Sequence, residues 1–149
     1  MCKRILWALV ACLAGDQSVA CSYVVPTQIY FERGSAELSR LQITKLSEWL
    51  NRSYEALPLY KGIAVETGAS GENPGEAKAL AELRAVNTVR ALRILLRTDL
   101  PIDTSSHGYR SPMSQLGENN DFAAIHLYPD VEGLKLPDCN PIPIPGFKR

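Results

Sequence analysis

One short segment contains the side-chain types of a nucleophilic triad, because Ser105, Ser106 and His107 closely follow Asp103. A working triad needs its serine, histidine and carboxylate to converge on one point. Neighbouring residues of a strand point to opposite faces, however, and residues 102–109 are predicted to form a strand. The spacing therefore indicates no catalytic relay, and we expect the chain not to be an enzyme.

Metal and phosphate sites are not indicated either. His107 and His126 are the only histidines of the sequence, and neither shows the short His, Cys or Asp spacing of metal ligands. Residues 68–71 contain two glycines but lack the lysine and the spacing of a phosphate-binding loop. We therefore expect neither a metal nor a cofactor.

The composition indicates one core and no strong overall charge. The chain has 149 residues, 46% of them hydrophobic, which is enough for one domain but not for two independent ones. Sixteen basic and sixteen acidic residues cancel, so the net charge attracts neither nucleic acid nor an anionic membrane. We expect no nucleic-acid partner.

A single arginine, Arg84, lies among small and apolar residues in the segment LAELRA at 80–85. Its planar guanidinium can bind a carboxylate through two parallel hydrogen bonds. Most arginines on a long helix instead pack their aliphatic stem along the surface and keep the charge in water. Both interpretations of Arg84 remain open on the residues alone.

Hydrophobic spacing and breaker residues predict six elements. Pro26 interrupts the first strand and favours an edge position or a strand start. Ser39 with Gln42 forms a capping box, and Asn73 before Pro74 forms a second helix start. The predicted strands cover 23–31, 59–67, 102–109 and 122–128, the helices 39–56 and 73–97, and the loops 68–73 and 110–120. This βαβαββ order predicts an α/β sandwich, a mixed sheet with helices packed on one face.

Residues 29–38 (IYFERGSAEL), a strand entering a helix through a Gly-Ser turn, and the helix segment at 80–85 resemble the OmpA-like domain. This peptidoglycan-associating module holds outer-membrane proteins to peptidoglycan. The resemblance covers roughly residues 23–129 and includes the turn at 108–112. It implies the βαβαββ fold and non-covalent peptidoglycan binding.

The resemblance also implies a site. In the family, an arginine on the second helix binds a carboxylate of diaminopimelate, and an aspartate in the preceding loop binds its ammonium group. Arg84 fills the arginine position, whereas the aspartate position falls on Ala69. We therefore expect weak binding, with Glu66, Glu72 or Glu76 as substitutes for the missing carboxylate.

The entry to the last strand departs from the family pattern. An Asn-Arg-Arg type sequence is usual there, and this chain has Asn120, Asp121 and Phe122, with no arginine. The expected function is weak, non-covalent peptidoglycan binding. The alternative is a structural or interaction module that has lost this ligand and meets another envelope protein through a Pro-rich tail or an exposed sheet edge.

The ends of the chain predict export. Residues 1–20 combine a basic start, a short apolar run and a small-residue cleavage site after Ala20, as in a signal peptide. Lipidation of Cys12 is the alternative. Residues 21–130 would form the OmpA-like domain and 131–149 a Pro-rich C-terminal tail. The expected location is the periplasm or outer membrane of a Gram-negative envelope.

Cleavage after Ala20 would leave two cysteines, Cys21 and Cys139. In an oxidising compartment they form a candidate disulfide between the start of the domain and its tail. The alternative is two free thiols.

Overall fold

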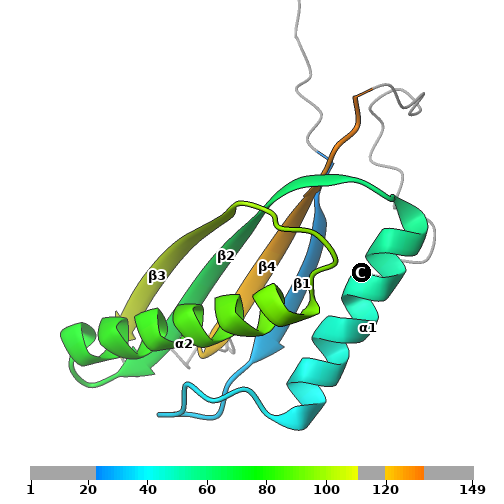
Figure 1. Cartoon of the computed structure of the whole chain (residues 1–149). Coiled ribbons are helices and arrows are strands. Elements are labelled where there is room, and N and C mark those ends of the chain that lie inside the picture. The colour runs from blue at the N-terminus through cyan, green and yellow to red at the C-terminus, as the bar shows by residue number, and fades with distance from the viewer. Residues whose placement is uncertain (1–22, 111–119, 133–149) are drawn as a thin grey trace, which may run out of the picture.

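A computed structural model describes residues 23–110 and 120–132. Its elements are β1 (Val25–Tyr30), α1 (Arg40–Ala56), β2 (Tyr60–Gly71), α2 (Pro74–Leu95), β3 (Ile102–Arg110) and β4 (Phe122–Pro129). Both helices lie on one face of the sheet (Figure 1). The predicted order and fold class are confirmed.

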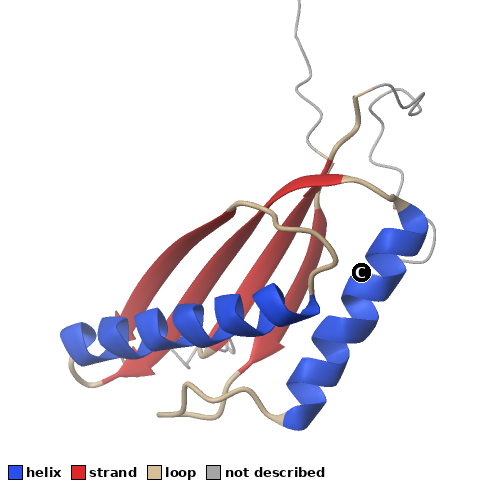
Figure 2. Cartoon of the chain, viewed as in Figure 1, coloured by secondary structure: helices blue, strands red, loops and turns tan. Residues whose placement is uncertain are grey.

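The sheet runs in the order β1-β4-β2-β3. β4 is antiparallel to both of its neighbours, and β2 and β3 are parallel, so the sheet is mixed (Figure 2). The last strand of the sequence therefore lies between the first and the second. β1 is an edge strand, as the proline at position 26 predicts, because proline cannot donate a ladder hydrogen bond.

The core lies between the sheet and the helices. Alternate residues of the two central strands point toward the helices and are buried, since side chains of a strand alternate between faces. α1 contributes one stripe of large apolar side chains and α2 a stripe that includes several alanines. The buried residues include Val25, Ile29, Leu46, Trp49, Leu50, Ile63, Val65, Ala81, Ala85, Leu92, Ala123, Ile125 and Leu127.

Both helices begin where the sequence predicts. Ser39 accepts a hydrogen bond from the backbone N–H of Gln42, and the Gln42 side chain accepts one from the N–H of Ser39, which completes the capping box. Asn73 caps α2 by accepting from the N–H of Gly75, with Pro74 in the first turn. Each cap satisfies backbone donors that a helix start otherwise leaves without partners.

The predicted loop at 68–73 is wrong for its first four residues. β2 continues to Gly71, because residues 68–71 pair in register with residues 107–110 of β3. Tertiary pairing here overrides the turn propensity of glycine and serine. The third strand also runs one residue further than predicted, to Arg110.

Several predictions concern residues outside the described ranges. They are the signal peptide, lipidation at Cys12, the disulfide between Cys21 and Cys139, and the tail beyond residue 132. None of the helices in the described ranges is long and apolar enough to cross a membrane.

Candidate functional site: a buried arginine and its carboxylate

Arg84 lies on the face of α2 that packs against the sheet and is completely buried, with 0% of its surface exposed. Its neighbours one turn away, Ala81 and Thr88, are also fully buried. The small residues on this face let the helix approach the sheet closely, and the long Arg84 side chain fills the space between the helix and the sheet. The charge is therefore removed from water, which requires partners inside the protein.

Three backbone carbonyls receive hydrogen bonds from the Arg84 guanidinium. Nε donates to the carbonyl of Ser35 at 2.8 Å, and Nη2 donates to that of Glu32 at 3.0 Å. Nη1 donates to the carbonyl of Gly68 at 2.7 Å. The ring of Phe31 lies 4.8 Å below the guanidinium carbon, a cation–π distance.

The counter-charge comes from Asp121, the residue directly before β4. Its Oδ1 lies 2.7 Å from Nη1 of Arg84, and its side chain is only 12% exposed. The same oxygen accepts a hydrogen bond from the backbone N–H of Ser70 at 3.2 Å. A buried ion pair of this kind is strongly destabilised when one partner is removed, because the other charge then stays desolvated.

Arg84 thereby connects three segments that are distant in sequence. Glu32 and Ser35 belong to the turn between β1 and α1, where Gly34 adopts a φ of +76° and the N–H of Ser35 donates to Glu32. Gly68 lies near the end of β2, and Asp121 enters β4. This arginine fixes how these segments meet.

The structure does not bring Glu66 to Arg84. In β2 the alternate residues Val65, Thr67 and Ala69 are buried, so Glu66 points to the opposite face of the sheet. There its Oε1 lies 3.4 Å from Nε2 of His107, and both side chains are about half exposed. A charge on that face cannot share a small ligand with the buried guanidinium.

Glu72 and Glu76 lie on the same side of the molecule as α2, at its N-terminal end. Both are exposed. Glu76 precedes Arg84 by eight residues (84 − 76), which corresponds to about 12 Å along the helix axis. Ala69, which occupies the expected aspartate position, is fully buried in β2. The peptidoglycan roles of Arg84, Glu72 and Glu76 stay predictions.

Asp121 is the residue that the sequence interpretation missed. The signal was present, because an acid stands where an arginine is usual, in a chain that retains the helix arginine. The negative charge of Asp121 complements the positive charge of Arg84. Residues with complementary charges often lie in contact in a folded protein.

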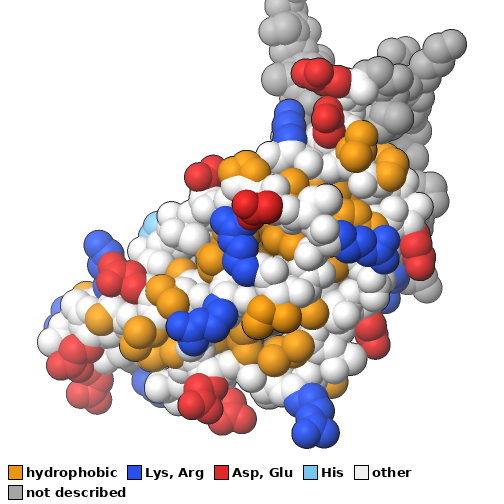
Figure 3. All heavy atoms as spheres, viewed as in Figure 1, with side chains coloured by type: hydrophobic (Ala, Val, Ile, Leu, Met, Phe, Trp, Pro, Cys, Tyr) orange, Lys and Arg blue, Asp and Glu red, His pale blue; other side chains and the backbone are white. Residues whose placement is uncertain are grey.

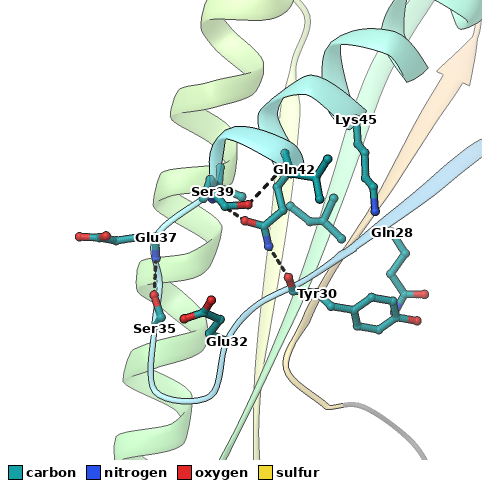
Figure 4. Close-up of a pocket in the computed structure, with 11 residues that line it drawn as sticks. Gln28, Tyr30, Glu32, Ser35, Glu37, Ser39, Gln42 and Lys45 are labelled. Carbon is teal, nitrogen blue, oxygen red and sulfur yellow. Dashed lines mark hydrogen bonds between the residues drawn. The ribbon is translucent and has the colours of Figure 1, made fainter.

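A cavity of about 520 Å³ lies beside this site, between β1 and the N-terminal half of α1 (Figure 4). Its wall includes the loop that Arg84 holds. The Gln42 side chain crosses it and donates to the carbonyl of Tyr30, while Lys45 points toward Gln28. The lining residues are Gln28, Ile29, Tyr30, Glu32, Ser35, Glu37, Leu38, Ser39, Leu41, Gln42 and Lys45.

The helix-bearing surface shows basic, acidic and apolar side chains intermixed (Figure 3). Leu41, Leu83, Val86 and Ile94 are the most exposed apolar residues of the helices. Among the described residues, no three His, Cys, Asp or Glu side chains are grouped closely enough to hold a metal ion.

No model of a known protein family matches this chain, and no curated protein sequence matches it. Solved structures do resemble it. One is the OmpA-like domain of FopA1 from Francisella tularensis subsp. tularensis SCHU S4, with a TM-score of 0.50 and 17% identity, covering 71% of this chain and 73% of that chain. Another is the peptidoglycan-associated lipoprotein from Burkholderia pseudomallei, with a TM-score of 0.45 and 18% identity, covering 67% and 88%. The chain therefore has the fold of an OmpA-like domain.

Proposed function

We propose that the chain is an exported cell-envelope protein whose OmpA-like domain acts as an interaction module, and that it has given up strong peptidoglycan binding. One observation carries this proposal. The guanidinium that the resemblance assigns to a ligand carboxylate is already bound by the chain's own carboxylate, Asp121, at 2.7 Å.

An external carboxylate would have to displace Asp121 from Arg84. The gain from pairing Arg84 with a ligand carboxylate would be offset by the loss of the existing ion pair, because Asp121 would give up its partner while its side chain is only 12% exposed. Binding would therefore be weaker than at a guanidinium that has no carboxylate of its own. The four hydrogen bonds of Arg84 to Ser35, Glu32, Gly68 and Asp121 support a structural role in the domain instead.

Weak peptidoglycan binding is the second candidate. It is favoured by the contact of Arg84 with the turn between β1 and α1, on the same side of the sheet as the exposed carboxylates at the start of α2. In this case Glu72 or Glu76 would bind the ammonium group of the ligand. The ligand carboxylate would compete with Asp121 for the guanidinium.

Co-sedimentation of the mature protein with purified peptidoglycan separates the two candidates. The proposal predicts little wild-type protein in the pellet. Asp121→Asn keeps the shape of the side chain but removes its charge, so we expect more pelleting from this variant because the Arg84 charge is then available. Circular dichroism and thermal melting of each variant show whether the fold is intact.

Glu72→Gln and Glu76→Gln test the second candidate directly, because it assigns the ammonium group of the ligand to one of these exposed side chains. If the wild type pellets with peptidoglycan, our proposal is wrong, and loss of pelleting in either variant identifies the second candidate as right. If neither the wild type nor Asp121→Asn pellets, the interaction-module proposal stands, and Arg84 serves the fold alone.

A further inference from the structure

The two edges of the sheet differ in how they are protected. β1 contains Pro26, and the side chain of Gln42 donates a hydrogen bond to the carbonyl of Tyr30 on the outer side of this strand. Proline and side-chain coverage are devices that prevent an edge strand from pairing with another chain. β3 is the other edge, and over its nine residues (IDTSSHGYR) it has neither a proline nor a lysine.

The backbone groups that β3 turns outward follow from its pairing with β2. The N–H of Ile63 donates to the carbonyl of Pro101, which directs the backbone groups of odd-numbered β3 residues toward β2. The even-numbered residues, Ile102, Thr104, Ser106 and Gly108, therefore direct their N–H and C=O groups away from the sheet. Hydrogen bonds between the described residues do not engage these groups.

We propose that β3 pairs antiparallel with β3 of a second copy of this chain, joining the two sheets about a two-fold axis. One register makes the strand complementary to itself, with Ser105 opposite Ser105 of the other copy. The outward backbone groups of Ile102 then meet those of Gly108, and those of Thr104 meet those of Ser106. Each of these pairs exchanges two hydrogen bonds.

Side chains on the open face of the sheet support this register. It places Asp103 directly opposite His107 of the second copy, and by symmetry His107 opposite Asp103. These positions form non-hydrogen-bonded pairs, in which Cα atoms lie about 4.5 Å apart and side chains are closest. Asp103 is exposed, and His107 is about half exposed and already lies beside Glu66. Each imidazole would thus face carboxylates from both copies.

The alternative registers lack this complementarity. A shift that places Thr104 opposite itself puts Asp103 against Ser105, and one that places Ser106 opposite itself puts Asp103 against Tyr109. A further shift puts two His107 side chains against each other. On the helix face, the favoured register also sets the hydroxyl of Thr104 against that of Ser106, a pair that can form a hydrogen bond.

Sedimentation velocity of the mature protein across a concentration series tests the association. Pairing of one short edge buries a small interface, so we expect a dimer with a dissociation constant on the order of micromolar. Ser106→Pro removes an outward N–H that the sheet itself does not use, and proline is tolerated on an edge strand. It also removes the Ser106 hydroxyl, which lies 3.0 Å from Oγ1 of Thr67, so Ser106→Ala is the control for loss of that contact. Ser106→Pro should weaken the dimer by at least ~10-fold and leave the circular dichroism spectrum unchanged.

Cysteine cross-linking tests the register. Ser105→Cys should give a disulfide-linked dimer under mild oxidation, because residue 105 faces itself across the axis. Asp103→Cys is the comparison on the same face, and it should cross-link much less because it faces residue 107. Because this variant also removes the carboxylate that faces His107, both variants are oxidised at concentrations at which sedimentation shows them to be dimeric. Both variants share the native cysteines, so any contribution from these cancels.

Three outcomes overturn the inference: a monomeric wild type at all concentrations, a dimer that Ser106→Pro does not weaken, and equal cross-linking at positions 103 and 105. If the wild type is a monomer, the β3 edge stays available to pair with a strand of a different protein. The inference does not depend on the ligand of Arg84, since neither measurement involves peptidoglycan. Its failure is therefore distinguishable from failure of the proposed function.

Discussion

Asp121 faces Arg84 from the chain position at which the resemblance to OmpA-like domains places an arginine, and its Oδ1 lies 2.7 Å from Nη1. Asp121 follows Arg84 by 37 residues, and the segment between them includes the end of α2 and all of β3. The resemblance implies a base at position 121, and this chain has an acid there, so the two side chains together carry no net charge.

Replacing Asp121 by alanine should destabilise the domain by about 3–5 kcal/mol, because the Arg84 charge stays buried without a partner. Urea denaturation followed by circular dichroism measures the free energy of unfolding. Asp103→Ala is the control, since this carboxylate is exposed and its loss should change stability by less than about 0.5 kcal/mol. Equal effects of the two substitutions would contradict a structural role for the ion pair.

Arg84→Lys should also destabilise the domain, by about 2–3 kcal/mol, although the charge is kept. A lysine ammonium has no planar fork and cannot reach the carbonyls of Ser35 and Glu32 together with Asp121. Amide hydrogen exchange should become faster in the turn at 32–35, which loses its anchor. Unchanged exchange there would mean that other contacts hold this turn.

Gly108→Ala should cost about 1–3 kcal/mol through overpacking. A Cβ at this position would lie 2.5 Å from the carbonyl oxygen of Pro74 and 2.6 Å from the backbone nitrogen of Lys78, so the start of α2 would have to shift. Gly62→Ala is the matched control, because its Cβ would meet atoms of Pro101 at 3.6 Å, an ordinary contact. Thermal unfolding of the two variants should differ clearly, and similar melting temperatures would contradict the close packing of α2 on β3.

Stability should fall at alkaline pH because burial raises the pKa of Tyr60 to about 12. The neutral phenol donates to the carbonyl of Ser53 at 2.6 Å. With an unfolded pKa of about 10, this contribution is complete below pH 10 and is lost as the pH rises through 12. A shift of this size corresponds to about 3 kcal/mol. Urea denaturation at pH 9 and pH 11.5 measures the larger part of this loss, because pH 11.5 is still below the folded pKa, and Tyr60→Phe is the comparison. A decline of equal size in both proteins would assign the effect to other groups.

Local signals in the sequence determined much of the fold. The capping box at Ser39 and the Asn73-Pro74 start predicted both helix beginnings, and Pro26 predicted the edge position of β1. The extension of β2 could not be predicted, because it depends on pairing with β3. Only the fold explains the glycine at position 68: a Cβ there would lie 2.6 Å from the ring of Phe122 in the neighbouring strand β4.

One of the two residues of the site, Arg84, was predictable from the sequence. Arg84 stands out by its surroundings and its family position, whereas its partner lies 37 residues away, and no local pattern connects them. Strand alternation excludes Glu66 on the sequence alone, because Ile63 and Val65 are apolar alternate residues of the strand and residue 66 must point to the other face.

The central place of β4 has a consequence for biosynthesis. Because the sheet order is β1-β4-β2-β3, a growing polypeptide that ends before residue 122 has no strand to bridge its first and second strands. The Arg84 charge would also have no carboxylate at that stage. Cooperative folding must therefore wait until almost the whole domain has left the ribosome, so the domain stays without its central strand for most of its synthesis.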